Sequence, residues 1–374
     1  MPIGRFIELA TVDRRLVCAP PHGASARHAG TQFRAEDGAI DAGCSWRYSE
    51  AGVNLRLAAS GYGATAPVVP ARREGLANAR IATHHSPRSL SAGMTRSAID
   101  LRNAPVQLEI IAGIIRLEAE SSTCFRELDG LVSSDQGAAA MVLRAANSPF
   151  YSRGREVGNI PYAITVLGFN VIRSLAILAF SRAIFAQTHN PLFRIHIWHH
   201  CLLTAIAGRR ICVDLGAAPS QDDAFIAGLM HDMGKVLLFN HDPRRYLRAL
   251  QLMLDSGCAS REAESTFMGM DHCEVGREAV VQWKLPARFL DFMARDLSLP
   301  QADYSTDPVR FSLALANKLI RGAGIGAREE RDPDIRKAGL AAFGPADALC
   351  DTWLRPQFMA DLTHDEAYRI CAQA

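Results

Sequence analysis

The chain has 374 residues, 48% of them apolar, which is enough to bury a sizeable core. A formal net charge of +2 gives no electrostatic reason to expect nucleic acid or an anionic membrane surface as a partner. Nine scattered cysteines without a Cys-x-x-Cys pair argue against a zinc ribbon or a disulfide framework. With no secretory signal and no apolar run near ~20 residues, the sequence predicts a cytoplasmic protein without a membrane span.

Residues 1–95 differ in character from the rest of the chain. They are rich in Ala, Gly, Arg and Ser and show little sustained periodicity, and Ser60–Pro70 reads as a linker. Two interpretations stay open. This part is a mostly disordered leader, or it is not native coding sequence and Met94 is the true start.

From about residue 104 the pattern is helical, and no alternating strand or Asn-Gly hairpin signal occurs. Asp135 can cap the first clear helix, and Asp307-Pro308 opens a later one. The predicted helices are 137–146, 171–187, 195–215, one from Asp222 into residues 231–232, 243–257, 260–270, 273–283, one from Pro286, 308–320, 347–354 and 365–372. The sequence therefore predicts an all-α, multi-helix bundle. Residues 301–374 form a C-terminal extension that completes this bundle or packs on it.

A His-Asp pair occurs three times, and its context separates the three copies. His241-Asp242 precedes a proline and is expected in a turn that caps the next helix. His364-Asp365 is expected at a helix N-cap near the C-terminus. Only His231-Asp232 ends an apolar helix and is followed by Gly234 and Lys235, so this pair is the candidate site.

Neutral imidazole and carboxylate suit ions such as Zn, Mn, Fe or Mg. Adjacent positions on a helix lie about 100° apart, so His231 and Asp232 can both lean toward one ion. His200, on the preceding predicted helix, would add a ligand, and Lys235 could hold a phosphate. The alternative is that these histidines are satisfied core residues.

Several blocks in order resemble the HDOD domain, a bacterial signalling branch of the HD phosphohydrolase superfamily. These blocks are residues 143–151 around Asn-Ser-Pro-Phe-Tyr, 160–169, 198–201, 227–235, and 264–276 with 283–286. The resemblance covers residues 104–300. It makes His200, rather than His199, the aligned histidine and adds His272 as a further candidate ligand.

The chain departs from the related cyclic-di-GMP phosphodiesterases in ways that bear on activity. Their His-His pair corresponds here to Phe292–Asp296, which contains no histidine, and no Gly-Tyr-Pro motif occurs. Their closing aspartate is placed at Asn317, whose neutral amide is a weaker ligand than a carboxylate. The resemblance therefore implies a degenerate site for at most one divalent metal ion (Mn, Mg, Fe or Zn), formed by His200, His231, Asp232 and Asn317.

The resemblance implies a bacterial signal-transduction module rather than an enzyme. Such a module would act through contacts with signalling proteins, and a nucleotide or a metal ion is a candidate ligand. The alternative is a metal-dependent phosphohydrolase acting on a nucleotide or cyclic dinucleotide, in which Lys235 would bind the phosphate.

Overall fold

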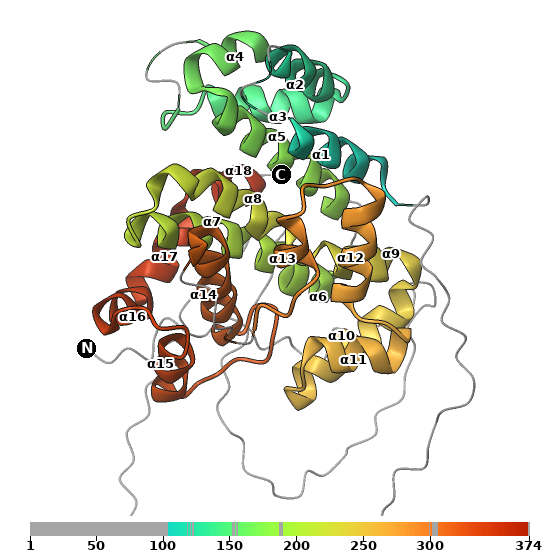
Figure 1. Ribbon diagram of the computed structural model, residues 1–374, viewed down its shortest axis with the longest axis vertical. Coiled ribbons are helices and arrows are strands. Elements are labelled where there is room, and N and C mark those ends of the chain that lie inside the picture. The colour runs from blue at the N-terminus through green and yellow to red at the C-terminus, as the bar shows by residue number, and fades with distance from the viewer. Residues whose placement is uncertain are drawn as a thin grey trace, which may run out of the picture. The chain divides into compact units, whose positions relative to one another are not determined.

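All regular secondary structure in the described part of the chain is helical, which confirms the all-α prediction (Figure 1). The computed structural model describes residues 104–372 except 118, 120, 122, 152, 153, 155, 187–189, 299 and 301–305. These described residues belong to one compact unit. The predicted leader at 1–95, the linker at 60–70 and the alternative start at Met94 lie outside them.

The helices follow one another with short connections. The N-terminal group comprises α1 (Val106–Arg116), α2 (Cys124–Ser133), α3 (Gln136–Ala146), α4 (Ile160–Leu167) and α5 (Phe169–Ala186). The central group comprises α6 (Pro191–Phe193), the π-helix η4 (Arg194–His199), α7 (His200–Asp214), the 3-10 turn η5 (Ala218–Ser220), α8 (Gln221–Met230) and α9 (Met233–His241). Next come α10 (Pro243–Ser256), α11 (Ser260–Met268), α12 (His272–Gln282) and α13 (Phe289–Met293). The last group is α14 (Pro308–Gly322), α15 (Pro333–Ala341), α16 (Asp347–Trp353), α17 (Pro356–His364) and α18 (Glu366–Ala372).

Side-chain caps begin the helices that the sequence predicted best. The Asp135 carboxylate accepts a hydrogen bond from the Ala138 N–H, and Asp307 accepts from the first turn of α14. Asp242 caps α10 and accepts from the Arg245 N–H at 3.0 Å, as predicted for the second His-Asp pair. Each cap satisfies backbone donors that a helix N-terminus leaves without a partner. The third pair is also a cap, because Asp365 accepts from the Ala367 N–H at 2.9 Å.

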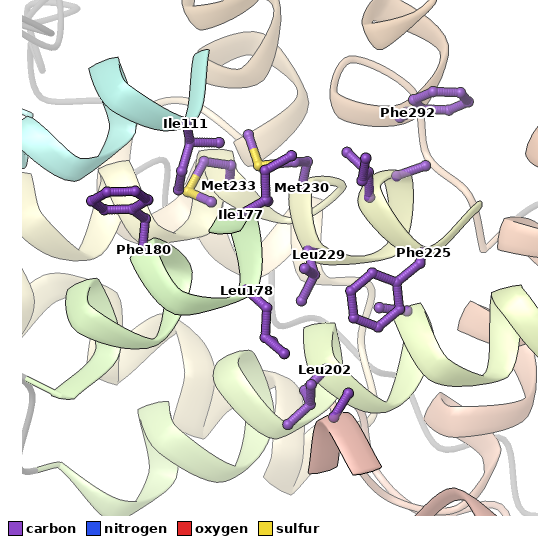
Figure 2. Close-up of a cluster of buried hydrophobic side chains, with 14 of the residues drawn as sticks. Ile111, Ile177, Leu178, Phe180, Leu202, Phe225, Leu229, Met230, Met233 and Phe292 are labelled. Carbon is purple, nitrogen blue, oxygen red and sulfur yellow. The ribbon is translucent and has the colours of Figure 1, made fainter. Parts of the chain in front are cut away.

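The larger of two apolar core clusters in the described residues gathers around α5 (Figure 2), and the smaller one is formed by α10 and α11. Figure 2 shows Ile111 of α1 and Ile177 of α5 beside Met230 and Met233, which flank the candidate His-Asp pair. By length and composition α5 is the one helix in the described residues that could cross a membrane, but 72% of that window is buried inside the fold. Burial on this scale is typical of a core helix.

Two close helix approaches position the candidate site. A Cβ atom on Gly228 of α8 would lie 2.3 Å from the Ala205 Cα of α7, and one on Gly234 of α9 would lie 2.0 Å from the His272 carbonyl oxygen. Only glycine fits at such distances. The first approach brings α8 against α7, and the second brings α9 against the start of α12.

The C-terminal extension is helical from Pro308 and packs on the rest of the unit. In Figure 1, α14 lies beside α7, and the two helices are in contact. Trp353 of α16 is fully buried and donates its indole N–H to Asp214 at the end of α7 at 2.9 Å. Helices α17 and α18 also contact α7. The extension therefore covers the helix that carries His200.

Candidate metal centre

Three predicted ligands meet where α7, α8 and α9 come together. His200 is the first residue of α7, His231 directly follows α8, and Asp232 precedes α9. The His200 Nε2 lies 3.2 Å from the His231 Nε2. The Asp232 Oδ2 lies 3.5 Å from the first of these nitrogens and 3.4 Å from the second. All three side chains are buried.

Backbone carbonyls fix which nitrogen of each imidazole faces the centre. The His200 Nδ1 donates to the Ile325 carbonyl oxygen at 2.9 Å, and the His231 Nδ1 donates to the Gly228 carbonyl oxygen at 2.8 Å. A carbonyl only accepts, so each Nδ1 carries the proton and each neutral ring presents an Nε2 lone pair. Burial lowers the pKa of both histidines, although Asp232 opposes that shift. Two lone pairs and a carboxylate oxygen therefore face one another, an arrangement that requires a cation or a proton between them.

The spacing of the three atoms fits a metal ion. Ligands about 2.0–2.1 Å from a tetrahedral ion lie about 3.3–3.4 Å from one another. The three separations of 3.2, 3.4 and 3.5 Å match one face of such a tetrahedron. His200, His231 and Asp232 are accordingly the set within the described residues whose ligand atoms converge closely enough to hold an ion.

Lys235 lies directly against this set. Its side chain is buried, and its Nζ donates to the Asp232 Oδ2 at 2.8 Å. Burial alone would raise the pKa of Asp232, but His231, Lys235 and His200 outweigh burial and hold that pKa well below its usual range. Asp232 is therefore ionised, and its nearest cation is Lys235. The predicted phosphate-binding role of Lys235 stays a prediction, because the ammonium bonds a carboxylate within the fold.

His272 lies beside the three ligands but is held by another residue. Its Nε2 is 3.9 Å from the Asp232 Oδ1, while its Nδ1 is 2.6 Å from the Glu264 Oε2. Burial lowers the pKa of His272, but Glu264 and the hydrogen bonds around the ring outweigh burial and raise it to about 10. With that pKa the ring is protonated at neutral pH when no metal is bound, and the predicted ligand role of His272 stays a prediction. Sequence reasoning did not single out Glu264, because a glutamate in a helix has no distinguishing pattern.

Asn317 reaches the same cleft from α14. The cleft is lined by His231, Asp232, Lys235, His272 and Asn317, so it contains the predicted residues except His200. The volume of this cavity is about 20 Å³. That is room for a water molecule or an ion and is far below the several hundred Å³ typical of small-molecule pockets.

Other residues around the site carried no sequence signal. Asp296 lines the cleft and accepts hydrogen bonds from the Ser298 N–H and hydroxyl, which lower its pKa although burial raises it. The Gly326 N–H donates to the His196 Nδ1 at 3.2 Å. Burial and the nearby Lys235 lower the pKa of His196 to about 4, so its neutral ring can accept this bond. The loop at residues 325–326 thus contacts both His196 and His200, one turn apart on the helix.

The remaining histidines of the predicted motifs lie outside the cluster. His199 points to the C-terminal helix, where its Nδ1 is 3.2 Å from the Tyr368 hydroxyl. His241 and His364 are exposed residues at the ends of α9 and α17. The choice of His200 over His199, and of His231-Asp232 over the other two pairs, agrees with this geometry.

Comparisons with known proteins identify the same family as the sequence motifs. The family model for the HDOD domain matches residues 104–297, which is more than half of the chain. An uncharacterised protein of Treponema pallidum (strain Nichols) is 20% identical over 195 residues, a region that covers 52% of this chain and 38% of that protein. The chain thus spans well under half the length of this curated relative.

Solved structures share the fold. An HDOD domain protein of unknown function from Geobacter sulfurreducens is 22% identical with a TM-score of 0.53, over 69% of this chain and 91% of that one. A Marinobacter aquaeolei VT8 protein provisionally assigned to signal transduction is 20% identical with a TM-score of 0.54, over 72% of this chain and 58% of that one. A provisionally assigned phosphohydrolase from Shewanella amazonensis SB2B is 21% identical with a TM-score of 0.51, over 72% of this chain and 93% of that one. With the family match, the predicted residues and the helical architecture in agreement, the chain belongs to the HDOD domain family.

Proposed function

We propose that this protein is a bacterial regulatory module that acts in the cytoplasm by binding other signalling proteins. In this proposal the His-Asp site holds at most one divalent ion and serves stability or sensing rather than turnover. The provisional assignment of the Marinobacter aquaeolei protein to signal transduction supports the first part. The geometry of the site supports the second.

The observation that carries the proposal is a small site in which the charges of Asp232 and Lys235 balance each other. The one carboxylate among its three candidate ligands, Asp232, already bonds the Lys235 ammonium. Asn317, the position at which the resemblance places the closing aspartate of related phosphodiesterases, brings only a neutral amide to the cleft. The cleft has room for an ion or a water molecule but not for a nucleotide. A nucleotide ligand would therefore require the cleft to open.

The residues of the site define which ligand atoms a bound ion would contact. His200 and His231 would offer neutral Nε2 lone pairs and Asp232 one carboxylate oxygen. A divalent ion held there would polarise a bound water or a phosphate oxygen. His272, as an imidazolium bonded to Glu264, can donate a proton but cannot accept one.

The test separates partner binding from the site. With tagged full-length protein as bait, we expect the same partner proteins to copurify with the wild type and with His231→Ala, with amounts within about 3-fold because the partner surface does not include the site. His241→Ala, the same substitution at an exposed histidine, is the control. A folded His231→Ala protein that loses every partner retained by His241→Ala would contradict the proposal.

The second candidate is a one-metal phosphohydrolase, and the metal-like spacing of the three ligand atoms favours it. It is tested with a panel of nucleotides, cyclic dinucleotides and phosphoesters in the presence of added Mn²⁺ or Mg²⁺. Turnover that disappears in Asp232→Asn would establish the hydrolase. No turnover across the panel, together with no metal in elemental analysis of the purified protein, would remove it.

A further inference from the structure

Lys235 and a metal ion at the candidate site would both contact the same oxygen atom. The Asp232 Oδ2 lies 3.4–3.5 Å from both imidazole Nε2 atoms, and it is also the oxygen that accepts from the Lys235 Nζ at 2.8 Å. Because ligand oxygens lie about 2.1 Å from an ion, a metal and this ammonium would be no more than about 5 Å apart. Both cations would be buried, where water screens little of their repulsion.

The charges of the site favour the ammonium. Among the three ligands only Asp232 carries a formal charge, and Lys235 balances it one to one. One oxygen of the nearby Glu264 carboxylate, Oε2, accepts from the His272 backbone N–H at 2.9 Å and lies 2.6 Å from the His272 Nδ1. A divalent ion added to this arrangement would leave excess positive charge in a site shielded from solvent.

A second position is open to the Lys235 ammonium, beside another carboxylate. A smaller cavity of about 10 Å³ shares Lys235 and Ser260 with the candidate metal cleft. Glu264 also lines this smaller cavity. Lys235 therefore borders two cavities, one with the candidate metal ligands and one with a second carboxylate. The four-carbon stem of a lysine can rotate from one such position to the other.

We propose that Lys235 is an internal cation that occupies Asp232 in place of a metal, and that a divalent ion binds only when the ammonium turns toward Glu264. This inference rests on the one-cation site of the proposed function. Lys235 is then a positioning residue. It sets the metal concentration at which the site changes from the ammonium-bound form to the metal-bound form.

Two variants test the competition. Lys235→Met keeps a long apolar stem but removes the ammonium, and we expect it to bind Zn²⁺ and Mn²⁺ on the order of 10-fold more tightly than the wild type in a chelator-competition titration. Lys337→Met is the matched control, because Lys337 also bonds an aspartate, Asp351 at 2.7 Å, but lies outside the cleft. Its metal affinity should stay within about 3-fold of the wild type. Equal or weaker metal binding by Lys235→Met, or no metal binding at all, would overturn the proposal.

A labelling experiment on the wild type needs no variant to fold. The chain has four lysines, Lys235, Lys284, Lys318 and Lys337, so mass spectrometry after amine acylation can follow each separately. We expect saturating Zn²⁺ to change the labelling rate of Lys235 several-fold, because its ammonium leaves the Asp232 Oδ2 for Glu264, while the other three lysines stay constant as internal references. An unchanged labelling rate of Lys235 with bound Zn²⁺ would refute displacement.

The outcomes also distinguish this inference from the proposed function. Partner capture is measured on the same Lys235→Met protein. If its metal affinity does not rise but its partners still copurify, the lysine role fails and the signalling module stands. If partners are lost in His231→Ala, the signalling proposal fails whatever the lysine does.

Discussion

At the scale of single residues, the orientation of His200 depends on a glycine turn far away in the sequence. The Ile325 carbonyl oxygen accepts the His200 Nδ1 proton, which leaves Nε2 free to face Asp232. The next residue, Gly326, has φ +87°, and a Cβ there would lie 2.5 Å from that same Nδ1. The absence of one methyl group thus allows the backbone to approach the ring closely enough to orient it.

Gly326→Ala should therefore weaken both the fold and the site. Gly344→Ala is its control, because Gly344 has a similar φ of +83° but open space where the Cβ would be. We expect backbone strain alone to lower the free energy of unfolding by about 1 kcal/mol in the control. Gly326→Ala should cost about 2 kcal/mol more and reduce Zn²⁺ affinity. Urea unfolding of the two proteins measures the difference, and equal losses would mean that the clash with His200 is relieved without cost.

At the scale of elements, the site depends on helices that touch through glycine. A Cβ on Gly228 would lie 2.3 Å from the Ala205 Cα and 2.6 Å from its backbone nitrogen, so α8 and α7 would have to separate. Backbone atoms cannot move aside as a flexible side chain can. His231 follows α8 and His200 begins α7, so a shift between these helices changes the distance between the two ligands.

Gly228→Ala is expected to destabilise the protein by about 3 kcal/mol or more. The same substitution at Gly130 in α2, where the added Cβ meets nothing within 4 Å, should have the opposite sign. Alanine is the better helix former, so Gly130→Ala should raise the free energy of unfolding by about 0.5–1 kcal/mol. Thermal and urea unfolding of both variants give the comparison. A Gly228→Ala protein as stable as the wild type would refute the close approach of α7 and α8.

A second element-scale prediction concerns the start of α12, where His272 lies. Asp271 accepts from the Cys273 and Glu274 N–H groups at 2.9 and 3.0 Å, and the Glu274 carboxylate accepts from the Asp271 N–H, which completes a capping box. Asp271→Ala should lower the free energy of unfolding by about 1–2 kcal/mol. Asp271→Asn retains a capping oxygen and should lose less than half of that in the same urea titration. A similar loss in both variants would assign the effect to the ion pair that Asp271 makes with Arg261, whose Nε lies 2.7 Å from the Asp271 Oδ2.

Features that depend on neighbouring residues, such as helix caps, could be predicted from the sequence. Features that depend on contacts between residues far apart in the chain could not. Capping aspartates placed the starts of α3, α10 and α14 within one residue of those in the structure. The π-helix η4 was missed, because helical periodicity does not distinguish it from the α-helix that it continues. His200, His231 and Asp232 were found through ordered motifs. The roles of His196, Glu264 and Asp296 were not predicted, although Glu264 begins one of the matching blocks, because these roles come from contacts made across the fold.

At the scale of the whole molecule, the structural unit is longer than the family match. The match ends at residue 297, yet α14 brings Leu313, Leu315 and Ile320 into the core and Asn317 into the cleft. A fragment ending at residue 300 should lack a cooperative thermal transition and bind a hydrophobic dye, because the faces of α7 and α8 that α14 covers would be exposed. Circular dichroism and dye fluorescence, compared with the full chain, check this. A fragment that melts cooperatively near the full-length temperature would show that α14 is dispensable.

The bond between His200 and Ile325 spans 125 residues of sequence, and this sets an order of events during synthesis. When the ribosome has made α7, α8 and α9, all three ligands exist, but the carbonyl that orients the first of them has not yet been translated. Until residues 325 and 326 emerge, the His200 imidazole has no fixed tautomer, and a metal ion would find two ligands in place rather than three. Any metal capture at this site is therefore expected late in the biogenesis of the protein, and not as a template for its early folding.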